Sequence, residues 1–370
     1  MRVRLTRPAA AAAFSRIAIV SVALVSGGLL LLAALGHERL FALLRLGEAP
    51  AGWWYFLIFL LTQWPGLFFE QVLTVRDKPW LLVCFGGVSA LGLVLSLLVP
   101  LYYGADLTHA LSVLAVFAGI KGAAILAWLI YDRSQDQPDP RPVAHLSPWR
   151  AAAWPLMVYA FVGSVVTAFD PWFVNYWYAG DEEIFATFRY GARELPLLAA
   201  ITNGAMVVVL PRLTEAPAAG LQLLKASSRR LMHWIFGGAI LIMVTVPWWW
   251  TMVFTEVFRE SLPLFRAYLF VVASRLLFPV PVLTARGHTR MLMVFGLSEL
   301  LINLMLSILL APQFGLMGII WATVIAYLID KIALMLYLKY RTGISPGRYT
   351  DFRWYGGYLA LMVAAYWFFG

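Results

Sequence analysis

Eleven apolar runs of 16 to 26 residues constrain this chain more than any other feature of its sequence. They fall near residues 17–36, 52–70, 80–103, 108–131, 151–176, 185–210, 231–254, 264–284, 291–311, 315–338 and 354–369. Each run is long enough, or nearly so, to cross a hydrocarbon core of ~30 Å as a helix. Only 13% of the residues are charged, whereas about a quarter are charged in soluble domains. We therefore predict an all-α polytopic membrane protein with about eleven transmembrane helices.

The cations outside these runs predict the orientation in the membrane. With the N-terminus inside, the inner loops hold nineteen Lys and Arg residues, and the outer loops hold only Arg39, Arg45 and Arg259. Cytoplasmic loops carry such an excess of cations. We expect a cell inner membrane protein with a cytoplasmic N-terminus. The first run also fits a signal peptide, although its apolar core of about 19 residues is long for one.

An internal repeat indicates how the helices are organised. Residues 72–86, VLTVRDKPWLLVCFG, align without a gap with residues 282–296, VLTARGHTRMLMVFG. The alignment relates the second predicted helix to the eighth, so an even number of crossings separates the copies. The two copies are then parallel repeats, a common plan in transporters. The alternative is that two apolar stretches match by composition alone.

The repeat predicts two unequal lobes. Residues 1–131 form a first lobe of four helices, residues 132–150 a polar, Pro-rich cytoplasmic linker, and residues 151–340 a second lobe of six helices. Residues 341–370 add a cytoplasmic loop and one further helix. We expect that the first lobe lacks its first two helices.

Two stretches of the second lobe resemble a known superfamily. Residues 168–213, AFDPWFVNYWYAGDEEIFATFRYGARELPLLAAITNGAMVVVLPRL, look like the first two helices of its second lobe. Residues 300–338, with an Asn-bearing helix, a short Gly turn and a small-residue helix, resemble its last pair. The superfamily is the multidrug/oligosaccharidyl-lipid/polysaccharide exporters, and the branch is the polysaccharide and O-antigen flippases. The resemblance implies two lobes that alternate access to the two sides of the membrane.

Ionisable residues inside predicted spans are candidates for function because they are costly there. Asp170 on the fifth span and Arg189 and Arg193 on the sixth lie at matching predicted depths. Arg189 and Arg193 are spaced i,i+4 and would share one helix face. That face could present a cationic fork to a diphosphate or neutralise Asp170 in a structural ion pair. Glu194 is expected to pair with either Arg or to lie towards Tyr190.

The remaining charges lie deeper in the predicted spans. Lys121 falls close to the midplane of the first lobe, and we expect it to face a wet cavity between the lobes. Arg275 is its counterpart in the second lobe. Glu299, Asp330 and Lys331 lie at one depth, and we expect a structural bridge between Glu299 and Lys331. Lys121, Arg189, Arg193, Arg275 and Asp170 are thus the predicted substrate pathway, with a surplus of cations that favours an anionic cargo.

These observations favour transport over catalysis. The main hypothesis is a flippase that exports a lipid-linked oligosaccharide of the polyprenyl diphosphate type, with membrane lipids and a glycan polymerase machinery as partners. The alternatives are an ion-coupled drug or metabolite exporter, in which Asp170 could serve as the coupling site, and a membrane glycan ligase or acyltransferase. The five histidines are scattered, Cys84 is the single cysteine and no nucleotide-binding loop GxxxxGK[ST] occurs. We expect no enzyme activity, no cofactor, no metal and no nucleic acid partner.

Overall fold

The computed structural model describes residues 24, 26–28, 30–44, 51–75, 79–134, 146–194, 201, 202 and 209–369. Every regular element in this part of the chain is a helix. Six helical segments are long and apolar enough to cross a membrane: 80–102, 107–128, 154–177, 217–254, 261–285 and 289–342. The prediction of an all-α polytopic membrane protein is confirmed.

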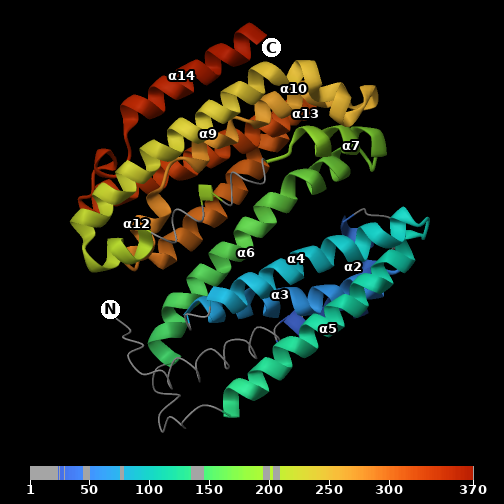
Figure 1. The fold of residues 1–370 in the computed structure, drawn as a ribbon. Helices are drawn as coiled ribbons and strands as arrows, with labels where there is room; N and C mark the ends of the chain where they lie inside the picture. The colour runs from blue at the N-terminus through green and yellow to red at the C-terminus, as the bar shows by residue number, and fades with distance from the viewer. Residues whose placement is uncertain are drawn as a thin grey trace. The chain divides into compact units, whose positions relative to one another are not determined.

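The chain divides into two compact units, residues 1–147 and 148–370. The finer boundaries 1–131, 132–150, 151–340 and 341–370 stay predictions. Unit 1 contains α2 (His37–Leu44), α3 (Trp53–Val75), α4 (Pro79–Tyr102) and α5 (Leu107–Ser134) (Figure 1). α5 packs against both α3 and α4, with Phe59, Leu114 and Ala118 buried together.

Unit 2 holds the remaining elements. They are α6 (Leu146–Trp177), α7 (Glu182–Gly191), α9 (Pro217–Phe254), η1 (Glu256–Phe258), α10 (Ser261–Tyr268), α11 (Val271–Arg275), α12 (Pro279–Ala285), α13 (Thr289–Thr342), η2 (Pro346–Arg348) and α14 (Phe352–Phe369). One large apolar cluster of buried residues joins α6, α9, α10 to α14 and the loop after α13. This cluster is the core against which the candidate site is built.

Two predicted spans differ from the helices observed. The predicted span 185–210 is not one helix, because α7 ends at Gly191 after ten residues, and much of the remainder, 195–200 and 203–208, lies outside the described residues. The predicted span 264–284 is divided into α10, α11 and α12. Pro279 and Pro281 lie in the first turn of α12, where a missing N–H costs little. Most of this divided segment is buried.

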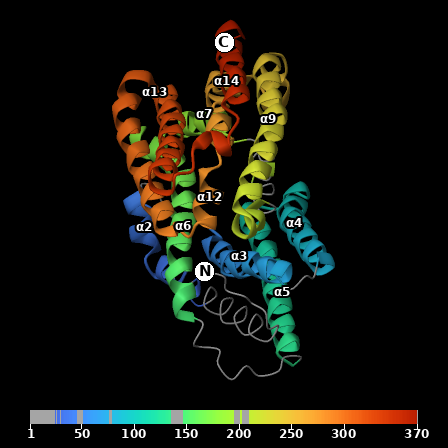
Figure 2. The ribbon, with the colours of Figure 1, turned by 90° about the vertical axis from the view of Figure 1, so that its left-hand side faces the viewer.

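The predicted helices 291–311 and 315–338 are the two halves of α13. They meet at Gly315, whose φ of 60° and ψ of −139° lie outside the helical region. Glycine adopts such a conformation without the clash that a Cβ would cause. The two halves lie side by side in unit 2 (Figure 2), so side chains 20 residues apart, such as those of Asn303 and Thr323, meet.

The last helix is part of unit 2. α14 packs along α9 (Figure 1), where the Tyr358 hydroxyl and Nδ1 of His233 are 2.8 Å apart. The Tyr358 ring also stacks on Phe236, with ring centres 5.7 Å apart.

The helix ends agree with the internal repeat at one junction. α3 ends at Val75 and α4 begins at Pro79, while α12 ends at Ala285 and α13 begins at Thr289. Both pairs of boundaries are separated by the offset of the sequence alignment, since 285 − 75 and 289 − 79 each give 210. In both aligned stretches, one helix therefore ends and the next begins at corresponding residues.

Candidate functional site

Asp170 is the buried carboxylate around which the site is built. It lies on α6 and is 5% exposed. Nδ2 of Asn303 donates to Oδ1 at 3.0 Å, and Oγ1 of Thr323 donates to Oδ2 at 2.6 Å. A buried charged or polar group is costly unless it has hydrogen-bond partners. The two halves of α13 supply one donor to each oxygen.

The partners of Asp170 form a polar network inside the unit. Oδ1 of Asn303 lies 3.3 Å from the Ser307 hydroxyl and 3.4 Å from that of Thr323. Asn303, Ser307 and Thr323 are fully buried. These three residues are not among the site residues predicted from the sequence. The signal that could have found them is a pair of polar residues, Asn303 and Thr323, within two apolar helices that a Gly turn folds against each other.

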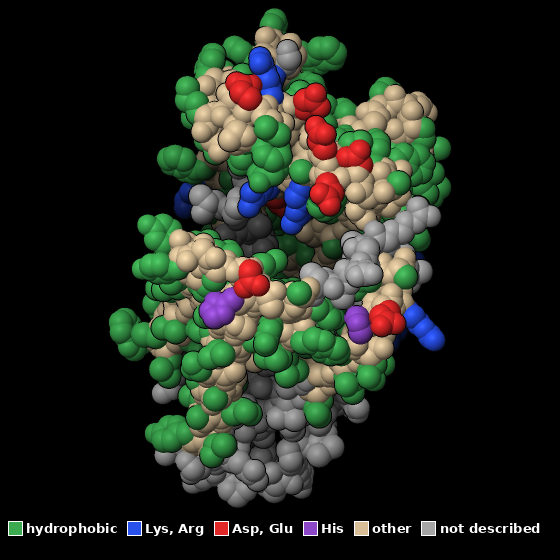
Figure 3. Space-filling view, turned by 90° about the vertical axis from the view of Figure 1, so that its right-hand side faces the viewer, with side chains coloured by type: hydrophobic (Ala, Val, Ile, Leu, Met, Phe, Trp, Pro, Cys, Tyr) green, Lys and Arg blue, Asp and Glu red, His purple; other side chains and the backbone are tan. Residues whose placement is uncertain are grey.

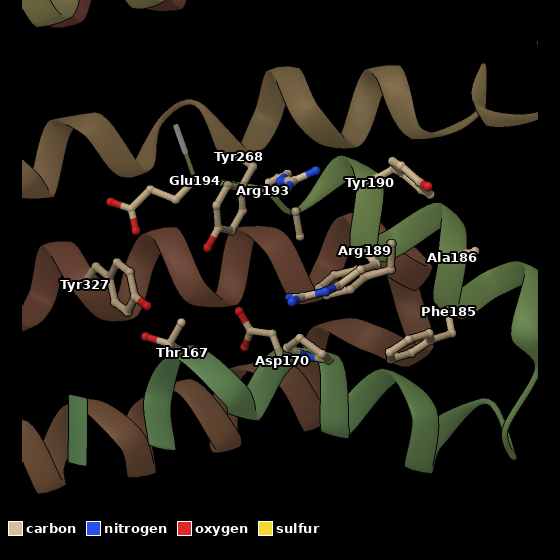
Figure 4. Close-up of a pocket in the computed structure, with 13 residues that line it drawn as sticks. Thr167, Asp170, Phe185, Ala186, Arg189, Tyr190, Arg193, Glu194, Tyr268 and Tyr327 are labelled. Atoms are coloured by element: carbon tan, nitrogen blue, oxygen red, sulfur yellow. The ribbon is translucent and has the colours of Figure 1, made fainter. Parts of the chain in front are cut away.

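A cavity of about 430 Å³ opens beside Asp170. α6, α7, α10, the segment after α7 and the second half of α13 line it (Figure 4). Its polar lining residues are Thr167, Asp170, Arg189, Tyr190, Arg193, Glu194, Tyr268 and Tyr327. Pro171 has no N–H, so the carbonyl of Thr167 lacks its usual donor four residues later. This cavity, hereafter the Asp170 cavity, is thus lined by two carboxylates, three phenol groups and two guanidinium groups.

Arg189 and Arg193 both line the cavity but do not share a helix face. Asp181 caps the N-terminus of α7 by accepting a hydrogen bond from the backbone of Ile184 at 3.0 Å. The helix ends at Gly191, so Arg193 lies beyond its last turn and the i,i+4 relationship is wrong. The Arg189 guanidinium points towards Asp170, whereas the Arg193 guanidinium points away from it (Figure 4). Neither forms an ion pair within the described part of the chain.

Glu194 pairs with Arg275 and not with Arg189 or Arg193. Nε and one terminal nitrogen of Arg275 donate to the two carboxylate oxygens of Glu194 at 2.9 and 3.0 Å. The Arg275 guanidinium also lies 5.0 Å from the ring centre of Tyr327. Such bidentate pairs are geometrically specific and strong. The charge of Arg275 is therefore paired with Glu194 in this structure, and its place in the substrate pathway stays a prediction.

Lys331 forms its ion pair with Asp330. Its Nζ lies 2.7 Å from Oδ2 of Asp330 on the same turn of α13. The preferred bridge between Glu299 and Lys331 does not occur among the ion pairs of the described residues. Glu299 lies on the first half of α13, whereas Asp330 and Lys331 lie on the second. The side chains of adjacent residues on a helix point in different directions. For this reason, a partner on another helix was predicted for Lys331.

Lys121 belongs to unit 1, apart from the residues above. It is 8% exposed on α5, and its Nζ donates to the side-chain oxygen of Gln63 on α3. The Phe59 ring centre is 5.9 Å from Nζ. Within unit 1 the ammonium lies between α3 and α5, and the cavity between the lobes that Lys121 is expected to face stays a prediction. Gln63, a polar residue in an apolar helix, is not among the site residues predicted from the sequence.

Carboxylates also gather at one end of unit 2 (Figure 3). Asp181, Glu182 and Glu183 begin α7, and Glu256 and Glu260 lie at η1 and before α10. All five side chains are exposed. Among the described residues, no group of three or more His, Cys, Asp or Glu is arranged to hold a metal ion.

Comparisons with known proteins support the fold. No protein-family model and no curated protein matches this chain. Among solved structures, a mutant of the Vibrio cholerae MATE transporter VcmN superposes with a TM-score of 0.62 at 16% identity, covering 90% of this chain and 80% of that one. The bent form of the same transporter gives a TM-score of 0.54 at 14% identity, covering 96% of this chain and 80% of that one.

Proposed function

We propose that this chain is a membrane exporter that works by alternating access, driven by a small cation that binds at Asp170. The observation that carries the proposal is a buried carboxylate, held by Asn303 and Thr323, on the wall of a polar cavity. An intramembrane carboxylate of this kind is typical of ion and proton pathways. The likeness to the fold of a MATE transporter supports the same conclusion. The proposed location is the inner membrane, with the N-terminus in the cytoplasm.

The cavity supplies suitable groups for such a cation. The carboxylate of Asp170 and the carbonyl of Thr167, left without its helical donor by Pro171, are oxygen ligands. In other transporters, transmembrane helices that are interrupted within the membrane coordinate Na⁺ or H⁺ through carbonyls without a helical donor. Arg189 points towards Asp170 across the cavity (Figure 4), although the two described side chains form no ion pair.

Transport by reconstituted protein tests the role of Asp170. The purified chain is reconstituted in proteoliposomes, and a Na⁺ or pH gradient is imposed across the membrane. This gradient is expected to drive transport of a fluorescent organic cation such as ethidium in the opposite direction. Asp170→Asn keeps the shape of the side chain but removes its charge, and gradient-driven movement should be lost. Asp181→Asn is the matched control, because Asn is also a good N-cap. Unchanged gradient-driven transport by Asp170→Asn would refute the proposal.

A lipid-linked anionic glycan is the second candidate substrate. The observation that favours it is that Arg189 and Arg193 line the cavity without an acidic partner among the described residues. Arg binds a diphosphate bidentately. Under this hypothesis Arg189→Gln and Arg193→Gln abolish movement of a short-chain polyprenyl diphosphate oligosaccharide in the same vesicles. Retention of ethidium export by these variants, with no glycan movement by the unmodified chain, would select the drug-type exporter.

A further inference from the structure

Unit 2 contains a second polar cavity besides the Asp170 cavity. It has a volume of about 350 Å³ and is named here the Lys331 cavity. Tyr159, Arg275, Lys331 and the hydroxyl residues Thr202, Ser274 and Thr284 contribute its polar lining. No lining residue is shared between the two cavities. Each cavity therefore has its own set of polar groups, although α6 and α13 line both.

The two cavities meet at the ion pair between Glu194 and Arg275. Glu194 lines the Asp170 cavity and Arg275 lines the Lys331 cavity. On α13, Tyr327 lines the first cavity and Lys331, one turn later, lines the second. One helical turn rises ~5.4 Å, so the partition between the cavities is thin. The Arg275 guanidinium, which lies over the Tyr327 ring, also belongs to this partition.

Solvent access distinguishes this pair from an ordinary buried bridge. The side chain of Arg275 is 32% exposed and that of Glu194 is 23% exposed. By contrast, Asp330 in the neighbouring pair is 1% exposed. In Figure 4 the Glu194 carboxylate and Tyr327 lie together at one side of the Asp170 cavity. A ligand in the Asp170 cavity can thus reach Glu194, while Arg275 stays open to the Lys331 cavity.

We infer that the Glu194–Arg275 pair is a closed gate on a passage for small monovalent cations through unit 2. The inference deepens the proposed function, on which it rests. While the pair is formed, the two joined side chains occupy the constriction and block it. A cation that neutralises Glu194 removes the partner of Arg275. The guanidinium then leaves the partition, and the two cavities become continuous.

Side-specific thiol labelling tests the gate without measuring transport. Cys84, the single cysteine, is first replaced by Ser. Thr167→Cys then places a probe in the Asp170 cavity, and Thr284→Cys places one in the Lys331 cavity. A charged, membrane-impermeant methanethiosulfonate reagent is added to one face of oriented proteoliposomes. With the pair intact, the two probes should react from opposite faces.

Glu194→Gln should change this pattern. Because the amide has no charge to hold Arg275, each probe is expected to react from both faces. The charge-swapped double variant Glu194→Arg/Arg275→Glu should restore one-sided labelling, since the attraction returns with its sign reversed. The control is Glu182→Gln, an exposed glutamate in the first turn of α7, which should leave labelling one-sided. Size-exclusion chromatography checks that each variant is folded.

Two results would overturn the inference. One-sided labelling that persists in Glu194→Gln shows that the pair is not the barrier, and two-sided labelling with the pair intact shows that no barrier exists. Either result leaves the role of Asp170 standing, because that role is judged by gradient-driven transport. Conversely, Asp170→Asn with unchanged transport removes the coupling role, while labelling still reports on the gate.

Discussion

Asn303 donates a 3.0 Å hydrogen bond to Asp170 across 133 residues of sequence. The bond joins the first half of α13 to α6 in the interior of unit 2. Thr323 on the second half of α13 donates to the other oxygen of the same carboxylate. Asp170 thereby holds three helical segments together and faces the cavity at the same time, so its network serves both stability and the proposed cation binding.

Removing one donor from Asp170 should destabilise unit 2. Thr323→Val has nearly the shape of Thr but leaves Oδ2 of Asp170 without its 2.6 Å donor. An unsatisfied buried acceptor costs about 1–3 kcal/mol, so the melting temperature in detergent should fall. Ser307→Ala is the control, because its hydroxyl contacts Asn303 and not Asp170. A fall as large in Ser307→Ala as in Thr323→Val would contradict the special role of the carboxylate.

Unit 1 offers a separate test of a buried charge. Gln63→Leu removes the side-chain oxygen that accepts from Lys121, and a buried ammonium without that partner should be strongly destabilising. Lys121→Met/Gln63→Leu removes both polar groups, and replacing both by apolar groups is often nearly neutral. Thermal unfolding of the two variants should therefore rank the double variant as more stable than Gln63→Leu. The reverse order would show that the hydrogen bond has no role in burying Lys121.

Gly191 sets the approach of α7 to α10. A Cβ at this position would lie 2.5 Å from Cβ of Leu264 and 2.9 Å from the carbonyl oxygen of Ser261. Gly191→Ala should push the end of α7 away from α10, displacing Arg193 and Glu194 and lowering the melting temperature by several degrees. Gly163→Ala on α6, where no atom lies within 4 Å, is the matched substitution and should not destabilise. Equal melting temperatures for the two variants would disprove the close approach.

The contact between His233 and Tyr358 should contribute to the docking of α14. Tyr358→Phe keeps the ring that stacks on Phe236 but loses the hydroxyl 2.8 Å from His233. We expect a loss of stability of about 1 kcal/mol and faster hydrogen exchange in α14. Tyr340→Phe, at a side chain that is exposed, should change neither. Unaltered exchange in Tyr358→Phe would show that apolar packing alone holds α14 on α9.

Several residues of the candidate site could be selected from the sequence, because they are ionisable and lie within predicted membrane spans. Asp170, Arg189, Arg193 and Glu194 do line one cavity. Their pairing was wrong, because α7 ends before Arg193 and because Glu194 reaches Arg275, 81 residues away. A helical repeat fixes which side chains share a face only while the helix continues. The donors Asn303 and Thr323 escaped selection because neutral polar residues are common in apolar helices.

Hydrophobicity and loop charge determined from the sequence alone that this chain is a helical membrane protein, because backbone groups in lipid must be satisfied within helices. The repeat related the second predicted helix to the eighth, and the helix ends at that junction agree with the alignment. Only the tertiary structure decided which polar groups meet. The end of α7 and the rotation of each helix arise from packing between distant segments, and a change of one or two residues in register turns a side chain to another neighbour. The partners of Asp170 and the pair between Glu194 and Arg275 depend on these features.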